Sequence, residues 1–207
     1  MRLETGGPMT VQLFHNPQSR ATMMHWLLEE LQLDYELVRV EYDDGSMRTP
    51  EFLEVSPMGK IPAIRDGEVT VSDTPAIAIY LADKYKTIDM APGIHDPRRG
   101  EYLRWLVFQS TAIDPAMLQA GMKFETSRQQ AGWGDVASVI DALETRLARA
   151  APYLFGDWFT TADLLVGGAL AWATMFGLFE GGPAMQRYVR ATTDRPAFMK
   201  TIAATRG

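Results

Sequence analysis

Residues 55–84 read VSPMGKIPAIRDGEVTVSDTPAIAIYLADK. The pattern predicts a loop, a strand, a tight turn at residues 65–68, a second strand and a helix. Pro62 begins the first apolar run, a position that suits proline because inside a paired strand it removes a ladder hydrogen bond. Proline is also the one residue whose preceding peptide bond adopts the cis form at low cost. Asp73 and Thr74 stand before the helix. From these residues alone, a plain β-hairpin leading into a helix is as good an explanation of the stretch as a functional role for Pro62, Asp73 and Thr74.

The residues before this stretch predict a small α/β domain. A short apolar strand at residues 11–14 is followed by a helix from Ser19, whose apolar residues recur at three-and-four spacing, and by an alternating strand at residues 34–41. Two strands joined by a helix of this length are typical of a parallel βαβ unit. A short helix capped at its start is expected at residues 49–53. The predicted order is therefore β-α-β-α-β-β-α within a domain at residues 9–86.

The remainder of the chain predicts a helical domain. Residues 87–96 contain Pro92 and Gly93, are followed directly by Pro97 and show no period, so we expect a linker there. Residues 97–207 show helical periodicity, with a bend expected at Pro115 because proline removes a backbone donor. Residues 160–163, TTAD, form a capping box with aspartate in the usual glutamate position, ahead of a nearly all-apolar helix that should be buried. Residues 1–8 show no period and are expected to form a flexible leader.

The composition excludes several classes of function. A net charge of −6 and a pI near 5.1 argue against nucleic-acid binding, which needs a basic surface. No apolar run approaches the roughly 20 residues that span a bilayer, so no membrane partner is expected. The chain has no cysteine, which excludes disulfides and a cysteine nucleophile, and three histidines are too few for the commonest metal sites. We expect a cytoplasmic protein without a metal.

Four segments resemble the glutathione S-transferase family. Residues 56–64, SPMGKIPAI, and 73–77, DTPAI, are similar to its signature, Asn-Pro-x-Gly-Lys/Gln-Val-Pro-Ala-Leu followed by Glu/Asp-Ser-x-Ala-Ile. Residues 26–31, WLLEEL, and the capping box at 160–163 resemble further landmarks, in the same order and spacing. The resemblance implies a thioredoxin-like domain followed by an all-helical domain, in a cytosolic, bacterial-type enzyme of the serine class with glutathione as co-substrate.

The resemblance also implies a glutathione site. The peptide bond between Ile61 and Pro62 is expected to be cis, so that the Ile61 backbone pairs with the cysteinyl backbone of glutathione. The hydroxyl of Thr74 and the nearby N–H groups are expected to bind the γ-glutamyl carboxylate, as helix starts suit anions. Asp73 is expected to accept from the α-ammonium, although the family more often has Glu-Ser at these two positions. Lys60 is the candidate for the glycine carboxylate, with an exposed lysine of no role as the alternative.

Thiol activation needs a group that lowers the thiol pKa from about 8.5. The family uses tyrosine, serine or cysteine, and Phe14 occupies the tyrosine position here. Counted from Trp26, the resemblance places the serine of the serine-type classes at Ser19, where a hydroxyl donor and the positive end of the first helix both favour thiolate. Asn16 is the runner-up and His15 the third candidate. A plain helix-capping serine is the structural alternative for Ser19.

The resemblance places a small hydrophobic electrophile between the two domains, against the first long helix of the second. Tyr102, Trp105, Phe108 and Met117 are the candidate lining residues, although an aromatic stripe at this spacing is more often core. The implied function is glutathione transfer in detoxification. The alternatives are a glutathione-dependent reductase, dehalogenase or isomerase, or a non-enzymatic binding or regulatory protein on the same fold. The resemblance further implies a homodimer.

Overall fold

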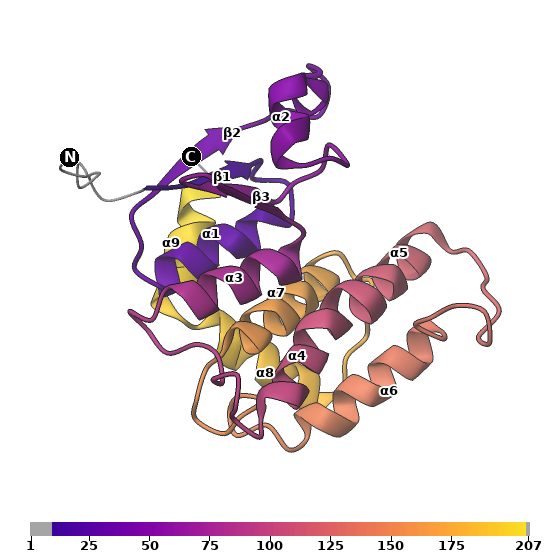
Figure 1. Ribbon diagram of the computed structural model, residues 1–207. Helices are drawn as coiled ribbons and strands as arrows, with labels where there is room; N and C mark the ends of the chain where they lie inside the picture. The colour runs from indigo at the N-terminus through magenta and orange to yellow at the C-terminus, as the bar shows by residue number, and fades with distance from the viewer. Residues whose placement is uncertain (1–9, 206–207) are drawn as a thin grey trace, which may run out of the picture. The chain divides into compact units, whose positions relative to one another are not determined.

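The computed structural model of the protein describes residues 10–205, so the leader expected at residues 1–8 lies outside the described residues. The chain divides into two compact units (Figure 1). Residues 10–88 and 200–205 form the first unit, and Asp89–Met199 form the second. Residues 200–205 were expected in the helical domain. They group with the first unit, where the Lys200 ammonium lies 2.6 Å from a Glu29 carboxylate oxygen.

The first unit contains a four-stranded mixed sheet in the order β2-β1-β3-β4. β1 and β2 are parallel, and the pairs β1–β3 and β3–β4 are antiparallel. The parallel pair requires a crossover, which α1 supplies, whereas the tight turn at Gly67 joins β3 to β4 directly. The strands are β1 Val11–His15, β2 Tyr35–Arg39, β3 Ala63–Asp66 and β4 Val69–Ser72.

Helices lie on both faces of this sheet. The side chains of β1 alternate, so that Leu13 and His15 are buried on the side of α1 while Phe14 packs edge-on against Phe52 of α2, with ring centroids 5.4 Å apart. Figure 1 shows α1 and α3 together on one side of the sheet and α2 on the other. Their bounds are α1 Ala21–Glu30, the 3-10 turn η1 Ser46–Arg48, α2 Pro50–Val55 and α3 Thr74–Lys84. The predicted β-α-β-α-β-β-α order is confirmed.

The second unit is helical, as predicted. The interruption in its first long helix falls just before Pro115, where a π-helical turn, η2, separates α4 from α5. The capping box at the start of α7 is present, and α7 is buried along most of its length. The bounds are α4 Arg99–Phe108, η2 Gln109–Ile113, α5 Asp114–Met122, α6 Val136–Leu147, α7 Thr161–Met175 and α8 Pro183–Thr193. The last helix, α9 Pro196–Thr205, begins in this unit and ends in the first. Between residues 10 and 205, no helix has both the length and the apolar character needed to cross a membrane.

Candidate functional site

The loop before β3 presents a backbone that the sheet does not use. The peptide bond between Ile61 and Pro62 is cis, which confirms the prediction. The β1–β3 ladder ends where Phe14 pairs with Ala63, so Ile61 lies beyond it. The buried Ser56 side chain fixes this loop, because its hydroxyl donates to the Lys60 carbonyl at 2.7 Å and accepts from the Lys60 N–H at 3.2 Å.

Arg48 lies against the same loop, and sequence reasoning missed it. A Cβ atom at Gly59 would lie 3.1 Å from Nη1 of Arg48 and 2.6 Å from the Met47 carbonyl oxygen, so only glycine permits this approach. Gly59 also has a φ of +60°, which favours glycine. Arg48 and Lys60 are both exposed. The available signal was a lone arginine directly before the capped helix, but nothing in the sequence pattern indicates that η1 packs on the loop before β3.

The start of α3 leaves its polar groups available. Asp73 is exposed, makes no capping hydrogen bond and has φ +72° and ψ 127°, an uncommon backbone conformation for a residue other than glycine. The first intrahelical hydrogen bond runs from Ile77 N–H to the Asp73 carbonyl at 3.0 Å, so the N–H groups of Thr74 and Ala76 precede the helical ladder. The Thr74 side chain is 7% exposed, and no partner for its hydroxyl lies within residues 10–205. These groups suit a bound carboxylate and ammonium.

The start of α1 is different, because Ser19 already has hydrogen-bond partners. Its hydroxyl donates to the Asn16 carbonyl at 2.7 Å and accepts from the Ala21 N–H at 3.1 Å. The side chain is 6% exposed. The second of these bonds satisfies a backbone donor at the helix start, which is the capping role considered as the alternative. To donate to a thiolate, the Ser19 hydroxyl must therefore turn its hydrogen bond away from the Asn16 carbonyl and toward the sulfur.

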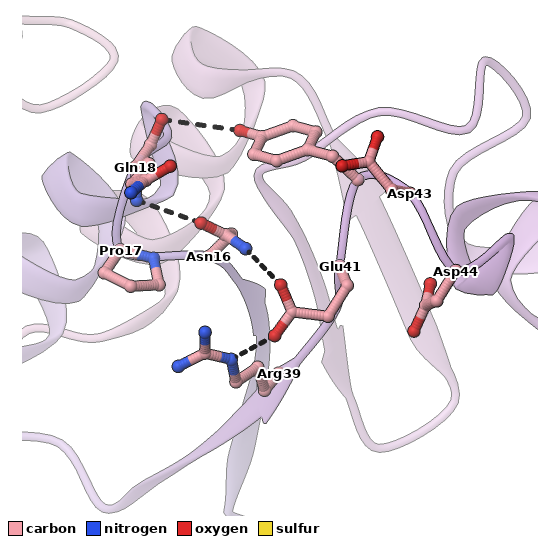
Figure 2. A pocket seen from close by; sticks show the side chains of 8 residues that line it. Asn16, Pro17, Gln18, Arg39, Glu41, Asp43 and Asp44 are labelled. Carbon is pink, nitrogen blue, oxygen red and sulfur yellow. Dashed lines mark hydrogen bonds and ion pairs between the residues drawn. The ribbon is translucent and has the colours of Figure 1, made fainter.

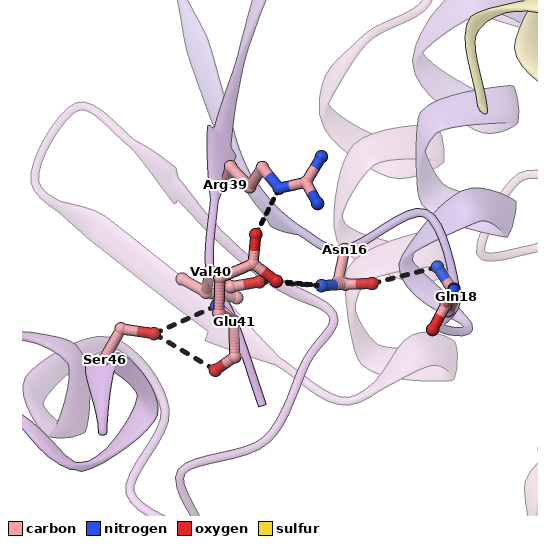
Figure 3. A network of polar contacts seen from close by, with 6 residues as sticks. All are labelled: Asn16, Gln18, Arg39, Val40, Glu41 and Ser46. Carbon is pink, nitrogen blue, oxygen red and sulfur yellow. Dashed lines mark hydrogen bonds and ion pairs between the residues drawn. The ribbon is translucent and has the colours of Figure 1, made fainter. Parts of the chain in front are cut away.

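Both amide hydrogens of Asn16, the runner-up, already have acceptors. Its Nδ2 donates to the Val40 carbonyl at 3.0 Å and to Glu41 Oε2 at 3.1 Å, and its Oδ1 accepts from the Gln18 N–H at 3.0 Å (Figure 3). Asn16 thus joins the loop after β1 to the end of β2. Ser19 has one proton to redirect, whereas Asn16 would have to give up a bond that holds the loop.

A polar hollow of about 460 Å³ lies beside this loop. Figure 2 shows Asn16 and Gln18 on one side and the carboxylates of Glu41, Asp43 and Asp44 on the other. Glu41 accepts hydrogen bonds from Arg39 and Asn16, so one of the three carboxylates already has a cationic partner. The hollow is lined by Asn16, Pro17, Gln18, Arg39, Glu41, Tyr42, Asp43 and Asp44.

His15, the third candidate, is buried on the α1 side of β1 and is 8% exposed. Burial, together with the charges of His25 and Arg39, lowers the pKa of His15 to about 4. The imidazole is therefore neutral at neutral pH.

The four candidate electrophile residues all belong to the second unit, and three of them are buried there. The Tyr102 hydroxyl lies 2.5 Å from the Thr161 hydroxyl, and Trp105 packs edge-on against Phe108 with centroids 5.1 Å apart. Met117 is also buried, and only Phe108 is half-exposed. Within the described chain, no three potential ligand side chains gather in a way that would hold a metal ion.

Comparisons with known proteins agree with this architecture. Residues 9–83 match the family model for the glutathione S-transferase N-terminal domain, and residues 126–191 match a model for its C-terminal domain. The fold and the cis-prolyl loop, with these matches, define a two-domain protein of the glutathione transferase class.

Individual relatives agree with the two family models. Glutathione S-transferase 3 of Zea mays is 32% identical, over 86% of each chain. A crystal structure of a glutathione transferase from Methylococcus capsulatus superimposes with a TM-score of 0.81 at 26% identity, covering 95% of this chain and 98% of that one. A Phanerochaete chrysosporium glutathione transferase in complex with oxidized glutathione has a TM-score of 0.80 at 27% identity, covering 96% and 97%. The chain belongs to the glutathione S-transferase family.

Proposed function

We propose that this protein is a glutathione transferase of the serine class, which binds glutathione and activates its thiol as a thiolate for attack on a small hydrophobic electrophile. The named transferases at 26–32% identity support the activity. The observation that carries the proposal is the start of α3, where Asp73 and Thr74 leave a carboxylate, a hydroxyl and two backbone N–H groups without internal partners among the described residues. If Asp73 and Thr74 served only to cap the helix, their side chains would accept hydrogen bonds from the N–H groups of the first turn.

In this proposal each part of glutathione meets one segment of the first unit. The Thr74 hydroxyl and the adjacent N–H groups bind the γ-glutamyl carboxylate, and Asp73 accepts from the α-ammonium. The backbone of Ile61, which lies outside the ladder, pairs with the cysteinyl backbone, with Pro62 beside it. Lys60 binds the glycine carboxylate, and Arg48 adds a second positive charge to the same loop.

Ser19 donates to the thiolate. Turning its hydroxyl from the Asn16 carbonyl to sulfur exchanges a neutral hydrogen bond of about 0.5–1.5 kcal/mol for a charge-assisted one of about 1.5–3 kcal/mol. The positive end of α1 adds about 0.3–1 kcal/mol. Because each pKa unit corresponds to about 1.4 kcal/mol, the combined gain lowers the thiol pKa by about one unit.

The remaining parts of the proposal concern the second substrate and the assembly. Phe108, which is half-exposed, is the candidate residue for the electrophile, and the buried Trp105 packs edge-on against it; Tyr102 and Met117 are buried in the same helical unit. We place the protein in the cytoplasm as a homodimer that acts in detoxification. Sedimentation at a mass near the 23.1 kDa monomer would contradict the dimer.

A second candidate function is a non-enzymatic glutathione-binding protein. The two hydrogen bonds of Ser19 favour it, because a hydroxyl used as a cap has no need to act on sulfur. The two functions share the α3 start and differ only at Ser19.

Retention on immobilised glutathione and turnover of a chloronitrobenzene test the proposal. A transferase is retained and active, and Ser19→Ala lowers its turnover while retention persists. Exposed Ser127 in the second unit provides the matched control, since Ser127→Ala should change neither. Retention without turnover supports the binding protein, and the absence of both refutes the two candidates together.

A further inference from the structure

Two buried histidines lie together behind the loop that carries Ser19. The ring of His15, the last residue of β1, meets the ring of His25 in α1 edge-on, with centroids 5.9 Å apart and an interplanar angle of 81°. His25 is 3% exposed. Neither Nε2 of His15 nor Nδ1 of His25 has a hydrogen-bond partner among the described residues. A buried nitrogen without a hydrogen-bond partner is uncommon. Two such nitrogens on rings that pack against each other therefore need a physical explanation.

The hydrogen bonds around His25 determine its tautomer. The Tyr35 hydroxyl donates its only proton to Glu29 Oε1. His25 Nε2 lies 2.8 Å from the Tyr35 hydroxyl oxygen and must therefore donate to it. A neutral imidazole with its proton on Nε2 has a bare lone pair on Nδ1. The atom that would accept a proton in acid is therefore the buried, unpaired one.

The negative charge beside the pair, that of Glu29, lies 3.9 Å from His25 Nε2 and is shared with other groups. α1 contributes Glu29, which already accepts from Tyr35 and from Lys200 of α9 at 2.6 Å. β2 contributes the Tyr35 hydroxyl and the positive charge of Arg39. α3, which also packs on α1, buries apolar side chains there: Ile77, Ala78, Leu81 and Ala82.

A proton on either ring would thus be buried, close to Arg39 or Lys200, and next to a second basic ring. The pKa of His25 is lowered, mainly by burial. The negative charge of Glu29 raises it, and the positive charge of Lys200 lowers it. For His15, burial and the charges of His25 and Arg39 lower the pKa to about 4.

The backbone of His15 is joined directly to the candidate thiol loop. Its carbonyl accepts from the Val40 N–H at 3.0 Å, and the next residue, Asn16, donates to the Val40 carbonyl at 3.0 Å. The Asn16 carbonyl in turn accepts from the Ser19 hydroxyl. A displacement of the His15 ring therefore acts on the hydrogen bonds that orient Ser19.

We propose that His15 and His25 are a positioning pair for residues 16–19, and that this loop holds the thiol of glutathione only while both rings are uncharged. Protonation of either ring in mild acid drives the rings apart and opens the loop. The consequence for glutathione rests on the proposed function, whereas the opening of the loop does not.

Amide hydrogen exchange of the full chain tests the opening without any ligand. If opening exposes one imidazole to water, the opening equilibrium rises up to about tenfold per pH unit between pH 6.5 and 4. The protection factors of the Ser19 and Ala21 amides should fall by that amount, while the Leu13 amide in β1 keeps its protection. A parallel fall at Leu13 would indicate unfolding of the whole unit and would overturn the positioning role. Constant protection at Ser19 would overturn it as well.

Variants assign the effect to the pair. His15→Phe keeps a ring of similar shape without a titratable nitrogen, and His15→Gln is the second variant if phenylalanine prevents folding. Either should reduce the pH dependence at Ser19, because only His25 can then take up a buried proton and no second charged ring faces it. His95, exposed in the second unit, provides the control, and His95→Phe should retain the wild-type slope. An unchanged slope in the folded His15 variant would refute the inference.

Binding of S-methylglutathione, which has no thiol to titrate, connects the pair to the site. We expect its affinity to fall between pH 7.5 and 4.5 in the wild type and in His95→Phe, and to fall at least about threefold less in His15→Phe. An equal fall in all three proteins counts against the inference. Absence of binding by the wild type at pH 7.5 refutes the proposed function instead, and hydrogen exchange then decides the inference alone.

Discussion

The helices α3 and α7 start with the same residue types, aspartate and threonine, and use them in opposite ways. At the start of α7, the Asp163 carboxylate is fully buried and accepts from the Leu154 N–H, the Thr160 N–H and hydroxyl, and the Tyr188 hydroxyl, at 2.7–3.0 Å. At the start of α3, Asp73 is exposed and makes no capping hydrogen bond.

The difference separates a structural helix start from one available to a ligand. A helix start provides several unpaired N–H groups in either case. When the chain supplies the acceptors itself, as at α7, the result is stability. When it leaves donors and acceptors unused, as at α3, the same groups remain free to bind glutathione. α1 is intermediate, because the Ser19 hydroxyl has partners but one of its bonds can be exchanged.

The largest effect is expected at the start of α7, called the closed start here because the chain itself supplies the acceptors. The start of α3, where Asp73 and Thr74 are unused, is the open start. Asp163→Ala leaves the Tyr188 hydroxyl and the N–H groups of Leu154 and Thr160 buried without an acceptor, at about 1–3 kcal/mol each. The free energy of unfolding should fall by about 3 kcal/mol or more, measured by urea denaturation. The change at the open start, Asp73→Asn, which keeps a residue that tolerates the positive φ, should cost less than about 0.5 kcal/mol. Equal losses in the two variants would remove the distinction between the helix starts.

Asp73→Asn should produce the next largest effect, on binding and not on stability. Asparagine tolerates a positive φ as aspartate does, so the fold should be unchanged. Loss of the charge-assisted bond to the α-ammonium, about 1.5–3 kcal/mol, should weaken glutathione binding by roughly ten- to a hundredfold. Isothermal titration calorimetry measures this. Unchanged affinity would mean that the exposed carboxylate has no ligand.

Ser19→Ala tests the intermediate start through its pH dependence. Without the hydroxyl, the pKa of bound glutathione should rise by about one unit, so thiolate absorbance and turnover at pH 6.5 should fall about tenfold. The deficit should shrink as the pH rises above the new pKa, because the thiol then ionises without help. Ser19→Thr should recover most of the activity. A deficit of constant size at every pH would point to the lost helix cap and not to thiol activation.

A threonine pair compares the two helix starts with the same substitution. Thr74→Val should weaken glutathione binding by about three- to tenfold, from the loss of about 0.5–1.5 kcal/mol, with little change in stability. Thr161→Val removes a hydrogen-bond partner of the Tyr102 hydroxyl and should cost about 1 kcal/mol of stability with unchanged binding. The reverse pattern would show that the open and closed starts have been assigned the wrong way round.

The smallest effects are expected at the two exposed cations. Arg48→Ala and Lys60→Ala should each weaken binding by about two- to fivefold, since exposed ion pairs contribute about 0.2–1 kcal/mol. Added salt should reduce both effects because it screens exposed charges. Equal losses in high and low salt would exclude a simple charge contact.

The sequence predicted the fold well because its signals are local. The period of β1 and α1, the cap at Thr49 and the capping box at residues 160–163 each depend on neighbours within a few residues, and all are present. The π-helical turn before Pro115 likewise follows from a backbone N–H that proline lacks.

The candidate site was harder to predict because its details depend on contacts distant in sequence. The sequence identified Ser19 and Asn16, but not that Asn16 uses its amide on Val40 and Glu41, which are more than twenty positions away. Arg48 was missed because only the fold brings η1 against Gly59. The edge-on packing of His15 on His25 depends in the same way on how α1 lies across β1.

The division of the chain has a consequence for synthesis on the ribosome. The first unit includes residues 200–205, so its sheet emerges early while the partner of Glu29, Lys200, emerges only after all of Asp89–Met199. At roughly 5–20 residues per second, that interval is on the order of ten seconds. During this time Glu29 and Tyr35 lack the ammonium that completes their network. The domain that is translated first is thus the last to acquire its full set of native contacts.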